Sequence, residues 1–309
     1  MGLNRFSLPA MAVIMMINAM LLSQGCLEEE RIALLQIKTS FAEYPNRKPN
    51  QLSYWGKDAL CCSWEGVTCS NSTTRRVVEI DLSYARYWYS SMGDWHLNAS
   101  LFLPFQELKV LDLAGNGIAG CVANEGFERL SRLAKLEVLY LGYNNFNNSI
   151  LSSLEGLSSL KYLYLCGNQL QGSINMKGPS KLNKLETLDL SYNNFNNSIL
   201  SSLDGLSSLK YLHLDGNQLE GSINMKEFDS LSNLEELSLA GNKIQDFIAL
   251  TGYEGPPRLN KLESLDLSYN KINDSTLSFF KGFSSLKHLH LRNQLDGSID
   301  TKGLCEFKP

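Results

Sequence analysis

A leucine-based unit that repeats along the chain constrains its fold more than any other feature of the sequence. The unit reads L-x-x-L-x-L-x-x-N, and a degenerate first copy spans residues 77–82. Further copies begin at Leu108, Leu136, Leu160, Leu185, Leu209, Leu234, Leu262 and Leu286. The stretch from Leu139 to Ile174 recurs from Leu188 to Ile223, a shift of 49 residues that equals two units. Because one unit cannot bury its own apolar side chains, about nine copies must stack, and the stack is the fold.

The letters of the unit give each position a structural role. In the copy that begins at Leu136, Leu139 and Leu141 alternate with Tyr140. This alternation predicts a short strand with its leucines in the core and its tyrosine on the opposite face. Asn144 ends that strand, and its amide can both donate to and accept from backbone groups of a buried turn. Stacked copies therefore predict a leucine ladder, an asparagine ladder and parallel strands about 4.8 Å apart.

The first 25 residues are predicted to be a secretory signal peptide. Arg5 supplies positive charge, an apolar stretch follows as far as Leu22, and small residues precede Cys26. An uncleaved anchor is the alternative, although the stretch is short for a bilayer span. No later run approaches about 18 apolar residues, so we predict no membrane helix after the signal peptide. We expect a secreted or extracellular chain, held at the plasma membrane if a longer parent chain carries a transmembrane helix.

Charge and cysteine usage narrow the function classes. The chain has 28 Lys and Arg against 32 Asp and Glu, a net charge of −4, which argues against nucleic-acid binding. All seven cysteines follow the signal segment, and disulfides are their expected state in an oxidising compartment. The block from Cys61 to Cys69 lacks the second cysteine pair of a zinc site, so we predict no metal and no cofactor. The spacing alone leaves open all three connectivities of four cysteines.

Five N-x-[ST] sequons are candidate glycosylation sites on exposed turns. They are Asn71, Asn98, Asn147, Asn196 and Asn273. Asn147 and Asn196 occupy equivalent places in the repeat, which favours a shared exposed geometry. The alternative is that several arise by chance in a chain rich in Asn and Ser and are never used.

The repeats resemble those of plant extracellular leucine-rich-repeat proteins. Residues 168–174 (N-Q-L-Q-G-S-I) and 217–223 (N-Q-L-E-G-S-I) are similar to the plant-type tail N-x-L-x-G-x-I-P. Asn175 and Asn224 stand where that tail has its proline. We therefore expect the second strand of the plant type, on the flank of the solenoid, to be less regular here.

Residues 26–76 resemble the N-terminal cap of the same class. Leu34, Leu35, Ile37 and Phe41 can form one helical face that covers the first repeat. The resemblance implies two disulfides, and they pair Cys26 with Cys61 and Cys62 with Cys69. The predicted fold is an α/β solenoid, a right-handed leucine-rich-repeat horseshoe with an N-terminal disulfide-stabilised helical cap. Its expected segments are a signal peptide (1–25), the cap (26–76), the repeats (77–300) and a truncated C-terminal end (301–309).

Cap and repeats together are most similar to the ectodomains of plant receptor-like proteins. That resemblance implies a non-catalytic recognition module that binds a peptide, a protein or a cell-wall glycan and signals through a co-receptor kinase. The chain departs from the family because residues 301–309 carry no paired-cysteine cap, and the last repeat is one residue short between Leu291 and Leu295. Two alternatives therefore remain, a secreted protein similar to polygalacturonase-inhibiting proteins and a truncated remnant.

The outward face of the strands is the candidate ligand-binding surface, because solenoids bind on their concave side and tyrosine is frequent at binding hot spots. The candidate residues are Tyr140, Tyr162, Tyr164, Tyr192, Tyr211, His213 and Asp215. The alternative is that aromatic residues simply favour strands. The sequence contains no catalytic signature, so we predict that the chain is not an enzyme.

Other chemistry-bearing residues are interpreted as structural. Asp112, Asp189 and Asp266 share one repeat position and are expected to be framework or solvated residues. His288 and His290 lie about three rungs, or roughly 14 Å, from His213, which is too far to share one metal ion. Cys166 is expected at an exposed strand position without a role of its own, and Cys121 and Cys305 are too many rungs apart to pair readily.

Overall fold

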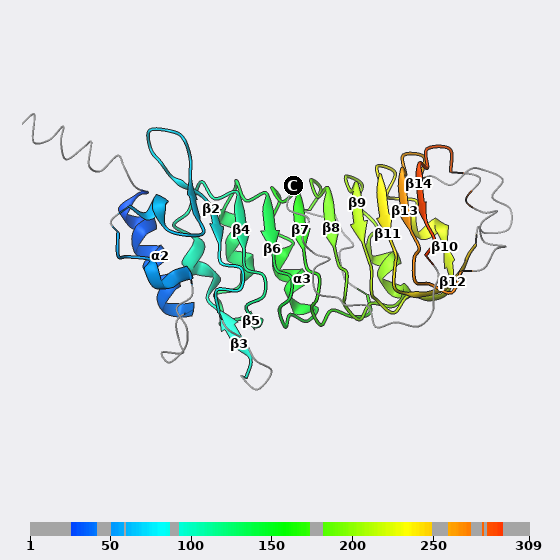
Figure 1. Ribbon diagram of the computed structural model, residues 1–309, viewed down its shortest axis with the longest axis horizontal. Helices are drawn as coiled ribbons and strands as arrows, with labels where there is room; N and C mark the ends of the chain where they lie inside the picture. The colour runs from blue at the N-terminus through cyan, green and yellow to red at the C-terminus, as the bar shows by residue number, and fades with distance from the viewer. Residues whose placement is uncertain are drawn as a thin grey trace, which may run out of the picture.

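A long solenoid with one continuous parallel sheet emerges from the repeats (Figure 1). The computed structural model describes residues 26–41, 51–58, 60–86, 93–173, 182–248, 259–272, 280 and 283–292. Within those residues nine parallel strands lie side by side in chain order. They are β2 (Val77–Asp81), β4 (Val110–Asp112), β6 (Val138–Tyr140), β7 (Tyr162–Tyr164), β8 (Thr187–Asp189), β9 (Tyr211–His213), β11 (Glu236–Ser238), β13 (Ser264–Asp266) and β14 (His288–His290). The predicted leucine-rich-repeat solenoid is confirmed.

The strands pair in register, so each repeat position forms a straight row across the sheet. Leu139 pairs with Leu163, and Leu163 pairs with Leu188. These leucines are fully buried, whereas their outward neighbours Tyr140 and Tyr164 are half-buried. The two-residue alternation of a strand separates the core from the concave surface, as the unit predicts.

The buried asparagines form the predicted ladder between successive repeats. The Nδ2 group of Asn193 donates to the carbonyl oxygens of Leu190 at 3.0 Å and Ser191 at 3.1 Å in its own repeat and Leu165 at 3.0 Å in the preceding one. Its Oδ1 accepts from the backbone N–H of Leu170 at 3.0 Å. The same arrangement recurs at Asn144, Asn168, Asn217, Asn242 and Asn270. Each asparagine satisfies turn groups that would otherwise be buried without partners.

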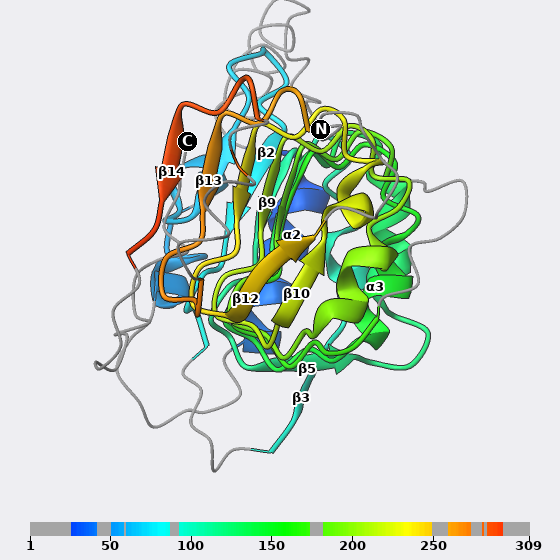
Figure 2. The ribbon, with the colours of Figure 1, turned by 90° about the vertical axis from the view of Figure 1, so that its right-hand side faces the viewer.

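Short helical turns lie on the side opposite the sheet in five of the described coils (Figure 2). They are η3 (Ala99–Phe102), η4 (Phe127–Arg132), α3 (Ser149–Leu154), η5 (Asn197–Ser202) and η6 (Met225–Phe228). The flank between carries two small parallel pairs, β3 (Trp95–Leu97) with β5 (Ile118–Cys121) and β10 (Glu220–Asn224) with β12 (Lys243–Ile248). Between them Gln171 and Asn194 make an isolated bridge. Within the described residues this flank sheet therefore occurs in separate pieces.

The N-terminal cap consists of α2 (Glu28–Phe41), η1 (Gln51–Tyr54), η2 (Cys61–Ser63) and β1 (Val67–Cys69), which pairs antiparallel with β2. Cys26 is bonded to Cys61 and Cys62 to Cys69, the pairing that the resemblance implies. Leu34, Ile37 and Phe41 of α2 are buried, whereas Leu35 is only partly buried against the core. The helix thus covers the apolar layer that the first repeat would otherwise expose.

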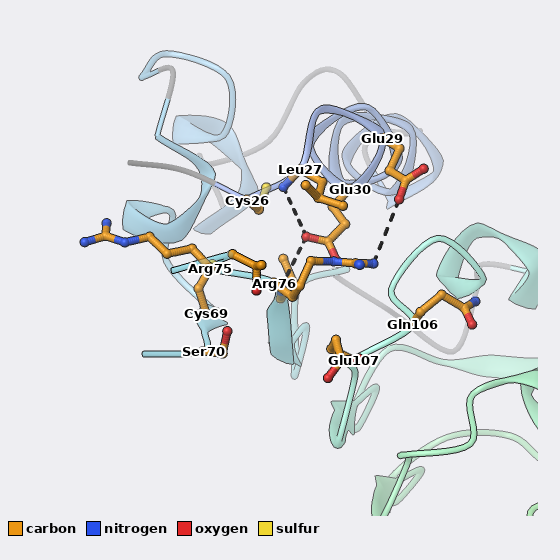
Figure 3. Close-up of polar contacts among 12 residues, drawn as sticks. Cys26, Leu27, Glu29, Glu30, Cys69, Ser70, Arg75, Arg76, Gln106 and Glu107 are labelled. Carbon is orange, nitrogen blue, oxygen red and sulfur yellow. Dashed lines mark hydrogen bonds and ion pairs between the residues drawn. The ribbon is translucent and has the colours of Figure 1, made fainter. Parts of the chain in front are cut away.

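One buried carboxylate joins the cap to the first strand (Figure 3). Glu30 of α2 has 0% exposure and accepts from Arg76 Nε at 2.7 Å. It also accepts from the backbone N–H groups of Val77 at 3.2 Å and Leu27 at 3.3 Å. Since the carboxylate is paired and hydrogen-bonded on several sides, its burial is compensated.

Several sequence predictions concern residues that the structure does not describe. They are the signal peptide at 1–25, the sequon at Asn273, Cys305 and the chain end at 301–309. Among the described helices none is both long and apolar enough to cross a bilayer.

Candidate functional site

Two rows of outward side chains run across the concave face of the sheet. Strand register places the first row in the order Tyr162, Thr187, Tyr211, Glu236, Ser264 and His288. The second row runs in the order Tyr140, Tyr164, Asp189, His213, Ser238, Asp266 and His290. Apart from the neighbouring Tyr140 and Tyr164, the residue type changes at every step along these rows, although the leucine between them is constant.

A groove of about 750 Å³ lies over these rows. Six of the seven predicted residues line it, namely Tyr162, Tyr164, Tyr192, Tyr211, His213 and Asp215. Tyr140 lies outside the lining and stacks on Tyr164, with ring centroids 4.6 Å apart and an interplanar angle of 13°. The structure therefore brings the predicted residues together on one surface. Their role in binding remains a prediction.

The groove extends further toward the C-terminal repeats than the aromatic pattern predicts. Additional lining residues include Glu236, Ser238, Ser264, Asp266, Ser268, Tyr269, His290 and Arg292. They hold the repeat positions that the predicted residues hold in earlier copies. Sequence reasoning missed most of them because it selected the surface by tyrosine content. Following each repeat position to the last strand would have found them.

Burial raises the pKa of four tyrosines on the concave face. It raises the pKa of Tyr192 to about 12 and raises the pKa of Tyr164 and Tyr140 above the usual phenol range. Burial also raises the pKa of Tyr211, which donates its hydroxyl to Glu235 Oε2 at 3.3 Å. These phenols therefore act as neutral hydrogen-bond donors and apolar surfaces at neutral pH.

Tyr192 is placed by the turn after the strand rather than by the strand itself. Its backbone is left-handed, with φ of 54°, and its ring lies over Gly216 of the next repeat. A Cβ atom at Gly216 would come within 2.5 Å of that ring, so glycine is required there. Tyr143 covers Gly167 in the same way. The prediction that Tyr192 lies on the face of the strand is wrong, because β8 ends at Asp189, although Tyr192 still lines the groove.

An acidic cluster surrounds His213 in the groove. Its Nδ1 lies 3.9 Å from Asp215 Oδ2, and its Nε2 lies 3.9 Å from Glu236 Oε1. Asp215 accepts hydroxyl hydrogen bonds from Ser191, at 3.1 Å, and from Ser238. These hydroxyls orient Asp215 between two neighbouring repeats.

The aspartates at the shared repeat position have a framework role. The Oδ1 atoms of Asp112, Asp189 and Asp266 each accept from the backbone N–H two residues later, at 2.8 to 2.9 Å. Asp189 is buried, and this burial raises its pKa, while nearby His213 acts in the opposite direction. These contacts fix the end of the strand and do not resemble an acid–base pair.

Cysteine and histidine predictions have mixed outcomes. Both parts of the prediction for Cys166 are wrong, because it is 2% exposed, its Sγ packs where a Cβ of Gly142 would lie, and it is disulfide-bonded. Cys121 is a half-buried free thiol, and burial raises its pKa to about 12.

His213 and His290 lie in one row with β11 and β13 between them. In the described part of the chain, no three His, Cys, Asp or Glu residues form a metal-binding group.

The described sequons differ in exposure. Asn71, Asn147 and Asn196 are exposed, whereas Asn98 is half-buried. The Oδ1 atoms of Asn147 and Asn196 accept from the backbone N–H two residues later, at 3.0 and 3.1 Å. The two therefore share one exposed geometry, and their glycosylation remains a prediction.

Comparison with known families agrees with this architecture. Residues 27–70 match the leucine rich repeat N-terminal domain. Leucine rich repeat families match residues 135–157, 172–219, 230–247 and 258–280. The cap and the repeats are thus recognised separately.

The curated relatives are plant receptor-like proteins. Cuscuta receptor 1 of Solanum lycopersicum is 37% identical over 147 residues, which cover 46% of this chain and 12% of the relative. Receptor-like protein 14 of Arabidopsis thaliana is 34% identical over 169 residues, which cover 49% of this chain and 16% of the relative. The chain therefore spans less than a fifth of the length of either relative.

Solved receptor ectodomains have a similar fold. The Arabidopsis receptor kinase HAESA, in complex with the peptide hormone IDA and the co-receptor SERK1, matches with a TM-score of 0.65 and 28% identity over 86% of this chain and 42% of that chain. The PEPR1–AtPEP1 complex matches with a TM-score of 0.51 and 25% identity over 84% of this chain and 37% of that chain. The chain belongs to the leucine-rich-repeat proteins, and its curated relatives are plant receptor-like proteins.

Proposed function

We propose that this chain is a non-catalytic extracellular recognition module of a plant cell-surface receptor-like protein. It binds a peptide or protein ligand on its concave face and signals through a partner kinase. The observation that carries this proposal is the groove of about 750 Å³, in which tyrosines from β7, from β9 and from the turn after β8 meet. A concave surface with aromatic side chains and placed polar groups is typical of binding sites.

The relatives and structural neighbours support this reading. The HAESA structure holds a peptide hormone and a co-receptor, and its ectodomain resembles this chain over most of the chain's length. The curated relatives are receptors or receptor-like proteins. The partner kinase and the extracellular location belong to the proposal, because the chain covers only a small part of those relatives.

The test replaces Tyr162, Tyr164 and Tyr211 together with alanine. A display library of random peptides of about twelve residues is first selected on the wild-type protein, and single binders are then measured by fluorescence anisotropy. Hot-spot tyrosines each contribute about 2 kcal/mol or more, so the triple variant should bind at least about 100-fold more weakly. Tyr54→Ala is the matched control, because Tyr54 is 61% exposed on the cap, away from the groove.

Secretion and circular dichroism of the triple variant should match the wild type. Unchanged peptide affinity in a folded triple variant would remove the concave face as the binding site. Mass spectrometry of the bound peptide should recover it intact, and cleavage would overturn the non-catalytic assignment.

A further inference from the structure

A row of alternating charges runs beside the strands and fails to alternate at one step. The residue just before each strand core is in turn Lys109, Glu137, Lys161, Glu186, Lys210, Glu235, Glu263 and Lys287. Ion pairs join Glu137 to Lys161 at 3.1 Å, Glu186 to Lys210 at 2.8 Å and Glu263 to Lys287 at 2.8 Å. At Glu235 the alternation breaks, because the next member, Glu263, is also acidic.

The break lies beside the groove. Glu263 donates its backbone N–H to the carbonyl oxygen of Glu235 at 2.8 Å, so the two acids occupy adjacent rungs. Glu236, the next residue along the chain, lines the groove. The row as a whole holds four lysines and four glutamates, but the two adjacent acids place a local excess of negative charge beside the groove.

The groove itself is also acidic. Its lining contains four carboxylates and a single guanidinium, and these are Asp189, Asp215, Glu236, Asp266 and Arg292. Arg292 follows β14 at one end of the groove, where its guanidinium carbon lies 6.0 Å from the Tyr269 ring centre. Among the described residues, His213 is the one basic side chain that lines the centre of the groove, over β9 and β11.

The His213 ring lies between two carboxylates without a hydrogen bond to either. Each ring nitrogen lies 3.9 Å from a carboxylate oxygen, which is beyond hydrogen-bond distance. Asp215 is fixed by Ser191 and Ser238, whereas the Glu236 side chain is 40% exposed and faces the groove. A lysine or arginine side chain that entered between Asp215 and Glu236 would contact two carboxylates at once.

The shape of the groove indicates an extended chain. Its lining spans six strands, from β7 to β14, which at about 4.8 Å per step is roughly 24 Å. An extended peptide of about seven residues has that length. An occupant without positive charge would take the two central carboxylates out of water and bring no cation to them, which is costly because the His213 ring and the serine hydroxyls compensate them only in part.

We infer that the occupant of this groove is an extended peptide that places a lysine or arginine side chain between Asp215 and Glu236. This inference rests on the proposed function and adds the charge of the ligand to it. Acidic peptides are excluded from the centre of the groove by the same carboxylates.

The experiment sequences the peptides selected from the random display library and counts their basic residues. Groove-dependent binders should be enriched in Lys or Arg over the unselected library. Replacing that residue by Glu in a synthetic binder should weaken affinity at least about 100-fold, and replacement by Gln about tenfold. Affinity should also fall as NaCl rises, since exposed charges are screened.

Charge reversal in the protein completes the test. Glu236→Lys should weaken the basic peptide at least about tenfold and improve binding of its Glu-substituted version, whereas Glu236→Gln should have a smaller effect. Glu137→Gln is the matched control, because Glu137 pairs with Lys161 outside the groove and its loss should change affinity less than about twofold.

The outcomes separate this inference from the proposed function. Peptides that need the groove tyrosines but lack basic residues, or that bind Glu236→Lys unchanged, would overturn the inference and leave the function intact. Failure to select any groove-dependent peptide, or binding of a neutral oligosaccharide in its place, would overturn both.

Discussion

The two faces of the same three-residue strands follow opposite rules. On the inner face Leu163, Leu188, Leu212 and Leu237 are at most 1% exposed and repeat without change. On the outer face the corresponding row reads Tyr164, Asp189, His213 and Ser238. The inner face must interlock with an identical neighbour above and below, whereas the outer face is not enclosed between identical layers. Uniformity along a row therefore indicates packing, and variation along a row indicates that stacking does not dictate the residue.

The largest loss of unfolding free energy is expected from a substitution on the inner face. Leu212→Ala removes a fully buried side chain from between two leucine layers and should cost about 4 kcal/mol of unfolding free energy. Its outward neighbour Tyr211→Ala should cost about 1 kcal/mol or less, because Tyr211 is only half-buried. Urea unfolding followed by circular dichroism measures both. Equal losses of unfolding free energy would mean that the outer row stabilises the fold as much as the inner row does.

A second comparison contrasts adjacent asparagines. Asn193→Ala removes a buried amide that serves four backbone groups, and the orphaned carbonyls and N–H should cost about 3 kcal/mol. Asn194 is exposed, and its side chain only accepts from Gln218 Nε2 at 3.1 Å. Asn194→Ala should change stability by less than about 0.5 kcal/mol. A small loss in both variants would show that water can replace the ladder.

The smallest effect on stability is expected at Asp189, a buried residue of the outer row. Burial raises the pKa of Asp189 in the folded chain above its unfolded value, so the folded state holds this proton more tightly. Stability from this group is therefore lost as pH rises through the folded-state pKa. Asp189→Asn keeps an Oδ1 acceptor for the Ser191 N–H and should be more stable than wild type at pH 7.

That advantage should disappear in acid, below the unfolded pKa of about 3.9, where both side chains are neutral. Thermal unfolding midpoints across this range measure the difference. A stability gap that stays constant with pH would assign the effect to packing instead of charge.

The sequence alone determined the regular part of this protein. Leucine spacing specified the parallel strands, and the asparagine after each strand specified the ladder, because both follow from local geometry repeated many times. The same register carried the predicted tyrosines of β7 and β9 onto one surface. The residue at each repeat position was enough to predict this surface. Because the repeats stack, residues at equivalent positions of successive repeats become neighbours in space.

Only the tertiary structure decided the extent of the groove, the burial of Cys166 and the position of Tyr192 in the turn after β8. Cys166 follows the second leucine of its strand, and its exposure depends on how closely Gly142 of the previous repeat approaches. Tyr192 depends on a left-handed turn and a glycine one repeat later. His213 acquires two carboxylate neighbours only because β9 and β11 pair in register and the turn after β9 brings Asp215 beside them. Except for the contact of His213 with Asp215 inside one repeat, these contacts join residues of different repeats, and no single unit of the sequence contains both partners.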